Sequence, residues 1–277
     1  MSSASLARAL ALSCHPVPSV AVTALTAGLA ALAGLPLGCG VLVTAAVFTG
    51  QLSIGWSNDC LDAERDRAVR RSDKPVASGA VAPPLAATAT GVALILTFAL
   101  SASLGWPGGA AALVVVVCGW LYNLGLKATV LSWLPYAIAF GMLPAVATLS
   151  ASPPRWPAIW ALTAGALLGV AAHLANVLPD LREDLATGVY GLPHRLGARA
   201  TALTGTAILL AVSAMILFGP GGQPSRWRWA GFAAAVLTVG TAAATAYRHP
   251  SSRRFFLATI LIAVLDLVFF ALNGTRL

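Results

Sequence analysis

Two short segments of the chain hold eight of its nine acidic residues, and both repeat one polar pattern. An asparagine and two aspartates recur at positions i, i+4 and i+8, which places them on one face of an α-helix. Side-chain oxygens of this kind are ligands for hard cations, and protein-bound Mg²⁺ commonly bridges carboxylates to substrate phosphates. The pattern therefore predicts a cation-binding cluster in each segment. The residues are Asn58, Asp62 and Asp66 in the first segment and Asn176, Asp180 and Asp184 in the second.

The first segment carries one further carboxylate, because Asp59, Asp62 and Asp66 fall at i, i+3 and i+7 on one helical stripe. Three negative charges this close repel one another unless cations neutralise them. The cation could be bound Mg²⁺, or it could be supplied by the basic residues that follow. A solvated helix end with ordinary salt bridges is the simpler interpretation, but the second acidic segment favours metal. The basic residues are Arg65, Arg67, Arg70, Arg71 and Lys74.

The second segment contains Pro179, which lacks an N–H and permits a kink at the start of the acidic turn. On a helix, Asn176, Asp180 and Asp184 share a stripe, whereas Glu183 points elsewhere. An ordinary helix end with a proline break is the alternative interpretation, and the presence of the first segment makes it the weaker one.

The composition indicates a membrane environment. Of the 277 residues, 58% are hydrophobic and 9% are charged, whereas a soluble domain carries about 25% charged residues. Apolar stretches of about 20 residues recur, each long enough to cross a bilayer core of about 30 Å, and they lack the alternation of barrel strands. We expect an all-α polytopic membrane protein, with residues 1–277 forming one domain of nine transmembrane helices. The predicted spans are approximately 18–35, 37–57, 86–104, 108–126, 129–149, 157–178, 200–218, 228–247 and 255–272.

The charge distribution predicts the orientation of this bundle. With the N-terminus in the cytoplasm, thirteen of the 17 lysine and arginine residues fall on the cytoplasmic side, as the positive-inside rule requires. Both acidic segments then lie at the cytoplasmic mouth of the bundle, where they can face a central cavity open to that side. This topology and attraction to anionic membrane lipid explain the net charge of +8, so no nucleic-acid partner is indicated. No obligate protein partner is evident, and we expect a multi-pass protein of the cell membrane.

Three motifs resemble those of the UbiA superfamily of intramembrane prenyltransferases. Its first signature is similar to Asn58-Asp-x-x-Asp62-x-x-x-Asp66, followed by Arg70, Arg71 and Lys74-Pro75-Val76-Ala77-Ser78-Gly79. Its second is similar to Asp180-x-x-x-Asp184 with Gly188-Val189-x-x-Leu192-Pro193-x-Arg195-Leu196-Gly197. Tyr122-Asn123 followed by Lys127 resembles an element that these proteins carry after their fourth helix. The order of the motifs and the nine spans extend the resemblance over essentially the whole chain.

The resemblance implies a binding site for an allylic prenyl diphosphate at the cytoplasmic mouth, with the isoprenoid tail in an apolar chamber between helices. Basic residues that match the family's diphosphate contacts are Arg71, Lys74 and Lys127, and Asn58, Tyr122 and Asn176 are further candidates for substrate binding. The residues that would hold Mg²⁺ and promote ionisation are Asp59, Asp62, Asp66, Asp180 and Asp184.

The implied reaction is Mg²⁺-dependent transfer of the prenyl group to an aromatic or other lipophilic acceptor. Metal and cations stabilise the charge on the leaving diphosphate, so the substrate ionises to an allylic cation that the acceptor attacks. A terpene cyclase on the same scaffold is the alternative, in which the substrate's own double bonds trap the cation. A transporter is disfavoured, because it predicts carboxylates near mid-bilayer.

Four residues depart from the family pattern or stay open. His15 occupies the stretch of the first helix where many members carry an arginine, and either it stands in for that arginine or the contact is absent. In the first signature, Lys74 replaces the commoner arginine, which keeps the charge but loses a bidentate fork. Asp266 lies within the last span and either serves in proton removal or acceptor binding, or is hydrogen-bonded to a neighbouring helix. His173 either orients an acceptor or is a satisfied packing residue, and the second interpretation is favoured.

Overall fold

The computed structural model describes residues 3–248 and 253–272. Within these residues the chain forms α-helices and short 3-10 helices and no strands, which confirms the all-α prediction. The long helices are α2 (Pro16–Leu32), α3 (Leu37–Leu61), α5 (Pro83–Ala102), α6 (Gly105–Asn123), α7 (Leu134–Leu149), α8 (Ile159–Val177), α10 (Leu192–Phe218), α11 (Arg226–Arg248) and α12 (Arg254–Leu272). The short elements are α1 (Ser3–Ser13), α4 (Ala63–Ala68), η1 (Leu126–Ala128), η2 (Leu178–Asp180) and α9 (Leu181–Ala186).

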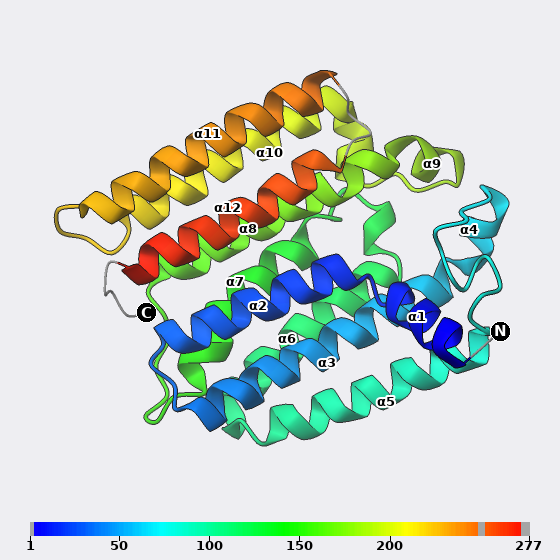
Figure 1. The fold of residues 1–277 in the computed structure, drawn as a ribbon, viewed down its shortest axis with the longest axis horizontal. Coiled ribbons are helices and arrows are strands. Elements are labelled where there is room, and N and C mark those ends of the chain that lie inside the picture. The colour runs from blue at the N-terminus through cyan, green and yellow to red at the C-terminus, as the bar shows by residue number, and fades with distance from the viewer. Residues whose placement is uncertain (1–2, 249–252, 273–277) are drawn as a thin grey trace.

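The long helices form two groups that lie side by side (Figure 1). One group contains α2, α3, α5, α6 and α7, and the other contains α8, α10, α11 and α12; the packing of α7 against α8 joins them. Each group has its own apolar core, around Val43 and Val146 in the first and around Leu209 and Ile262 in the second. Because the two cores are separate, the space between the groups can hold a cavity.

A helix lies at each of the nine predicted apolar stretches in the described part of the chain. Six helical segments are long and apolar enough to cross a membrane, and a seventh span results if α1 and α2 are counted as one bent element. The apolar helix α7, with 16 residues, is shorter than those spans. The structure therefore supports a multi-pass membrane protein, and the figure of nine spans stays a prediction.

Both acidic segments lie at one end of the bundle, the end at which α1, α4 and α9 are found (Figure 1). Neither segment is a continuous helix, so the predicted single helical face is interrupted in each. The first breaks at Asp62, between α3 and α4, and the second passes through η2, which contains Pro179. Because proline lacks an N–H, the α-helical hydrogen bonds cannot continue there.

Two further breaks bring residues toward this end of the bundle. The axes of α1 and α2 differ by 67°, and His15, between them, has a left-handed backbone with a φ of 55°. Gly197 interrupts α10 with a φ of 76° and a ψ of 164°, a conformation that glycine adopts without steric cost. The predicted span 200–218 is the part of α10 that follows this break.

The joint between the two groups depends on two glycines of α8, spaced four residues apart. A methyl group on Gly169 would collide with the backbone of Tyr136 in α7, and one on Gly165 would lie 2.6 Å from the carbonyl oxygen of Phe140. Small residues at this spacing allow membrane helices to approach closely.

Replacing Gly169 by alanine should therefore push α8 away from α7. We expect the Gly169→Ala variant to lose about 1–3 kcal/mol of stability, the usual cost of overpacking, measured as a lower Tm of the detergent-purified protein. Gly91→Ala is the matched control, because nothing lies within 4 Å of its added methyl group. Equal Tm values for the two variants would contradict this description of the joint.

Candidate functional site

The three carboxylates of the first acidic segment are buried. Asp59, Asp62 and Asp66 are only 1%, 7% and 6% exposed. These carboxylates therefore do not lie at a solvated helix end, although the salt bridges of the simpler interpretation are present. Burial of three carboxylates demands cations or hydrogen-bond donors around them, and the neighbouring segments supply both.

Asp62 is the most heavily paired of the three. Its carboxylate contacts the ammonium of Lys127, which comes from η1, and lies 2.9 Å from Nη2 of Arg65. Asn58 also donates from Nδ2 to Asp62 Oδ2 at 3.0 Å. Burial lowers the pKa of Lys127, and the nearby charge of Asp62 opposes this shift. Lys127, which the family resemblance identifies as a diphosphate contact, thus lies beside the predicted cation-binding cluster.

Asn123, for which no role was predicted, fixes the orientation of Asn58. It donates from Nδ2 to the Ile54 carbonyl and to Ser57 Oγ, both at 2.9 Å, and accepts from Asn58 Nδ2 at 3.2 Å. Since a carboxylate only accepts hydrogen bonds, the amide nitrogen of Asn58 must face Asp62. Its carbonyl oxygen is therefore turned away from both partners.

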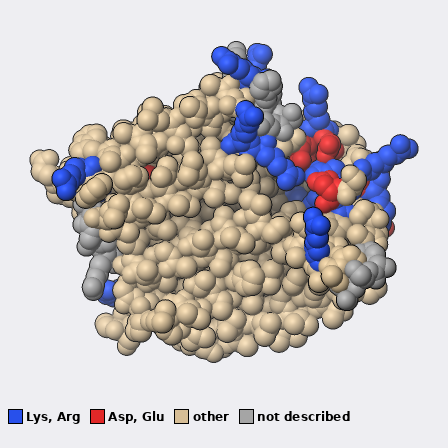
Figure 2. Space-filling view, in the orientation of Figure 1, with Lys and Arg blue, Asp and Glu red and all other residues tan. Residues whose placement is uncertain are grey.

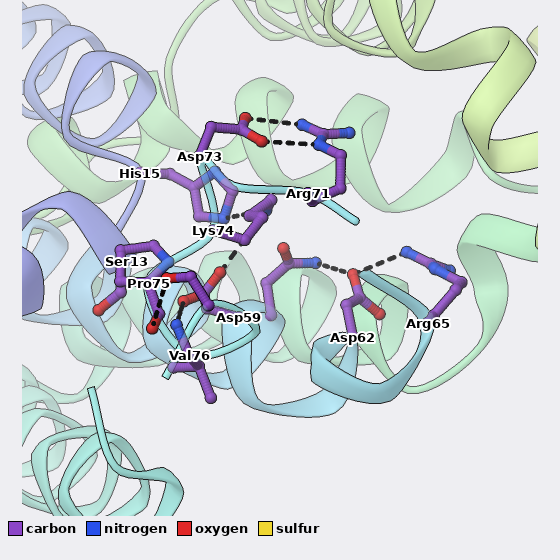
Figure 3. Close-up of polar contacts among 12 residues, drawn as sticks. Ser13, His15, Asp59, Asp62, Arg65, Arg71, Asp73, Lys74, Pro75 and Val76 are labelled. Atoms are coloured by element: carbon purple, nitrogen blue, oxygen red, sulfur yellow. Dashed lines mark hydrogen bonds and ion pairs between the residues drawn. The ribbon is translucent and has the colours of Figure 1, made fainter. Parts of the chain in front are cut away.

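Asp59 receives its partners from the loop that follows α4 (Figure 3). The backbone N–H of Val76 donates to Asp59 Oδ2 at 3.1 Å, and Lys74 Nζ lies 3.8 Å from Oδ1. The same ammonium is 3.1 Å from His15 Nε2. Because an ammonium only donates, that imidazole nitrogen is the acceptor. His15 thus contacts Lys74, the lysine at the position where an arginine is commoner.

Two carboxylate oxygens in this segment are left without hydrogen-bond partners. Asp59 Oδ1 and Asp66 Oδ2 are both buried and accept no hydrogen bond, although the ammonium of Lys74 lies 3.8 Å from Asp59 Oδ1. Burial raises the pKa of Asp66. Unsatisfied buried oxygens cost free energy that a bound cation would recover. The donor set of the first segment therefore fits a hard divalent cation such as Mg²⁺.

The guanidinium of Arg71 joins the two acidic segments. Its Nη1 lies 2.6 Å from Glu183 and 3.3 Å from Asp180, and its Nε and Nη2 bind Asp73 at 2.8 and 2.9 Å. The hydrogen bond from Arg71 lowers the pKa of Asp73 to about 2 and raises the pKa of Arg71 itself. Glu183 thus belongs to the site, although the helical pattern placed its side chain off the stripe of Asp180 and Asp184.

Asp184 has a different partner, His194 of α10. The two side chains approach to 3.2 Å between Nε2 and Oδ2. Within residues 3–248 and 253–272, no three acidic, histidine or cysteine side chains converge on one point. Asp59, Asp62, Asp180 and Asp184 are paired instead with a lysine, an arginine, a histidine or a backbone N–H, so a cation that recruited several of them would have to displace these partners.

A cavity of about 300 Å³ adjoins this charged layer. Three of the predicted substrate-binding residues line it, namely Asn58, Tyr122 and Asn176, together with His15. Most of its wall is apolar and comes from α2, α7 and α12. The hydrogen bonds Asn58–Asp62 and His15–Lys74 connect the cavity to the carboxylates and the ammonium groups. Acidic and basic side chains gather at this end of the molecule (Figure 2).

The two residues whose roles the sequence leaves open, His173 and Asp266, are buried and make side-chain hydrogen bonds, although Nδ1 of His173 has no hydrogen-bond partner. His173 is 1% exposed, and its Nε2 lies 3.0 Å from Ser132 Oγ, which also accepts the N–H of Leu192. Asp266 is buried and accepts a hydrogen bond from Ser213 of α10 at 2.9 Å. Among the residues of α12 that line the cavity, Phe256 is nearest the charged end. Asp266 is ten residues farther along this helix, a separation of about 15 Å.

The described residues thus form an all-helical membrane protein with buried carboxylates beside an apolar cavity. The chain belongs to the UbiA prenyltransferase family, whose model matches residues 19–265.

Solved structures of other members share this fold. An apo UbiA homologue from Aeropyrum pernix is 18% identical over 92% of this chain and 98% of that chain, with a TM-score of 0.74. A UbiA homologue from Archaeoglobus fulgidus, bound to GPP and Mg²⁺, is 15% identical over 95% of this chain and 98% of that chain, with a TM-score of 0.74. A structure described for digeranylgeranylglyceryl phosphate synthase is 15% identical over 98% of this chain and 99% of that chain, with a TM-score of 0.68. None of the curated protein sequences is similar enough to match.

The Asp266–Ser213 contact makes a prediction for stability. Ser213→Ala leaves a buried carboxyl without its donor, so we expect a loss of about 1–2 kcal/mol. Adding Asp266→Leu to that variant removes the polar group as well and should restore most of the Tm. Ser103→Ala, at an exposed hydroxyl bonded only within its own helix turn, is the control. A double variant less stable than Ser213→Ala would argue against this pairing.

Proposed function

We propose that this protein is an Mg²⁺-dependent membrane prenyltransferase that moves a prenyl group from an allylic diphosphate to a lipophilic acceptor. The observation that carries this proposal is the junction of buried carboxylates and ammonium groups with an apolar cavity. Such a site is matched to an amphiphile with an anionic head and a hydrocarbon tail. The complexes of the Archaeoglobus fulgidus homologue with GPP and with DMAPP, both with Mg²⁺, support the same assignment here.

The metal ligands would be the carboxylates of both segments, Asp59, Asp62, Asp66, Asp180 and Asp184. Asp59 and Asp66 each have a buried oxygen without a hydrogen-bond partner, and these oxygens are the strongest indication that a cation fits there. When bound, Mg²⁺ supplies positive charge that stabilises the leaving diphosphate.

The chain's own cations have a second task. Arg71, Lys74 and Lys127 are held by carboxylates in the described structure. With those carboxylates bound to metal, the three side chains would be available to donate to phosphate oxygens, and Arg71 could bind two oxygens at once. They would neutralise the diphosphate as its bond to the first carbon of the prenyl chain breaks.

Side chains that line the cavity would position the reacting end of the substrate. Asn58, held by Asn123, and Asn176 place amide groups at the junction of cavity and charged layer. Tyr122 packs its ring edge-on against Tyr136 at 5.1 Å and gives an aromatic face to the cavity. Polar groups near the mouth favour an external acceptor, whereas the apolar walls suit the alternative, a terpene cyclase.

The topology belongs to the same proposal. We take all nine long helices as spans, with the N-terminus and both acidic segments on the cytoplasmic side, because α7 and α11 pack against helices that are long and apolar enough to cross a membrane. The cavity would then open toward the cytoplasm at the charged layer and receive the tail from the bilayer.

Substitution of one carboxylate in each segment tests the proposal. With an aromatic or other lipophilic acceptor supplied, Asp62→Ala and Asp180→Ala should each lower Mg²⁺-dependent diphosphate release from ten- to twenty-carbon prenyl diphosphates by about 10²–10³-fold, the usual effect of removing one charge-stabilising group. Glu64→Ala, at an exposed carboxylate of the same segment, should keep wild-type activity. Turnover in the presence of a chelator, or wild-type turnover by either aspartate variant, would refute the metal assignment.

The organic products distinguish the two reactions. A transferase releases diphosphate only when an aromatic or other lipophilic acceptor is supplied, and the product contains that acceptor. A cyclic hydrocarbon or terpene alcohol formed without an acceptor would establish the cyclase instead.

A further inference from the structure

A second cavity lies behind the first, farther from the charged layer. It measures about 80 Å³ and is lined by helices α2, α7, α8, α10 and α12. The two cavities share the side chains Leu25, Phe140, Leu143, Leu168, Ala263 and Leu267. Those side chains form the boundary between the cavities, so a flexible chain in the first reaches the second by displacing only apolar groups.

Helix α8 gives the depth of each cavity from the charged end. Asn176 lines the first cavity, Leu168 lines both, and Trp160 lines the second. At 1.5 Å per residue, the boundary at Leu168 is about 12 Å from Asn176, and Trp160 is about 24 Å from it.

These depths can be compared with prenyl chains. With carbon–carbon bonds of about 1.5 Å, each five-carbon unit extends about 5 Å, so a ten-carbon chain spans about 10 Å and a twenty-carbon chain about 20 Å. A ten-carbon chain with its diphosphate in the charged layer ends before the boundary. A twenty-carbon chain crosses it and ends short of Trp160.

From this match we infer that the second cavity binds the distal half of the prenyl chain, so that the preferred substrate is a prenyl diphosphate of fifteen to twenty carbons. The inference rests on the proposed function and adds the substrate's length to it. Asp266 is the one acidic side chain in this lining, and its hydrogen bond from Ser213 satisfies the carboxylate oxygen Oδ2. The remaining lining residues are apolar apart from the indole N–H of Trp160, as a hydrocarbon chain requires.

The far wall of the second cavity sets the limit on chain length. Trp160 packs against Phe270 with 5.5 Å between ring centroids, and both side chains line this cavity. Removal of the indole should lengthen the cavity, whereas a larger side chain at Ala161, which also lines it, should shorten it.

The test is the Mg²⁺-dependent affinity of the full-length protein for the thiolo analogues of geranyl and geranylgeranyl diphosphate, which bind without ionising. We expect the wild type to bind the twenty-carbon analogue at least tenfold more tightly than the ten-carbon one. Ala161→Leu should reduce that ratio to about twofold without changing the Kd of the ten-carbon analogue. Ala271→Leu, at an exposed position at a similar depth of α12, should keep the wild-type ratio.

A second variant acts in the opposite direction. Trp160→Ala should bind a twenty-five-carbon thiolodiphosphate at least threefold more tightly than the wild type does. Equal affinities of the wild type for ten- and twenty-carbon analogues, or an equal loss of both in Ala161→Leu, would overturn the inference while leaving the proposed function intact. If no analogue binds the wild type at all, the proposed function itself fails.

Discussion

Burial of carboxylates at the edge of a membrane bundle is the constraint on which the site depends. A carboxylate removed from water is stable only beside a cation or several donors, and Asp59 and Asp62 satisfy this requirement with groups from two other segments. Lys74 and the N–H of Val76 hold the loop after α4 against α3. Lys127 holds the turn after α6 against Asp62, at the end of α3. Arg71 extends the network to the second acidic segment, so charge neutralisation also sets the geometry of the cavity mouth.

Much of the fold is predictable because apolar length is a strong local signal. The nine apolar stretches coincide with helices, and Pro179 marks the break before α9. The bends at His15 and Gly197 were not predicted, since neither the φ of 55° at His15 nor the φ of 76° at Gly197 follows from local hydropathy. The predicted span 129–149 begins instead at Leu134, because η1 and the residues after it turn Lys127 and Ser132 toward the site.

The candidate site was predictable in its residue types but less so in its pairings. The aspartates, Arg71, Lys74 and Lys127 were identified by charge and motif, and the structure brings them to one end of the bundle. The hydrogen bonds of Asn123, Glu183 and His194 were not predicted, because they join residues that are 65, 112 and 10 positions apart in the sequence. Polar residues near a recognised motif are the only sequence signal that could have found them.

The most direct test of the account is a structure of the protein with Mg²⁺ and the thiolo analogue of geranyl diphosphate. We predict Mg²⁺ at about 2.1 Å from carboxylate oxygens of both acidic segments, with Lys127 and Arg71 moved from Asp62 and Asp180 to the diphosphate. The tail should lie in the cavity lined by Asn58, Tyr122 and Asn176. A complex in which these ion pairs persist and the diphosphate binds elsewhere would contradict the account.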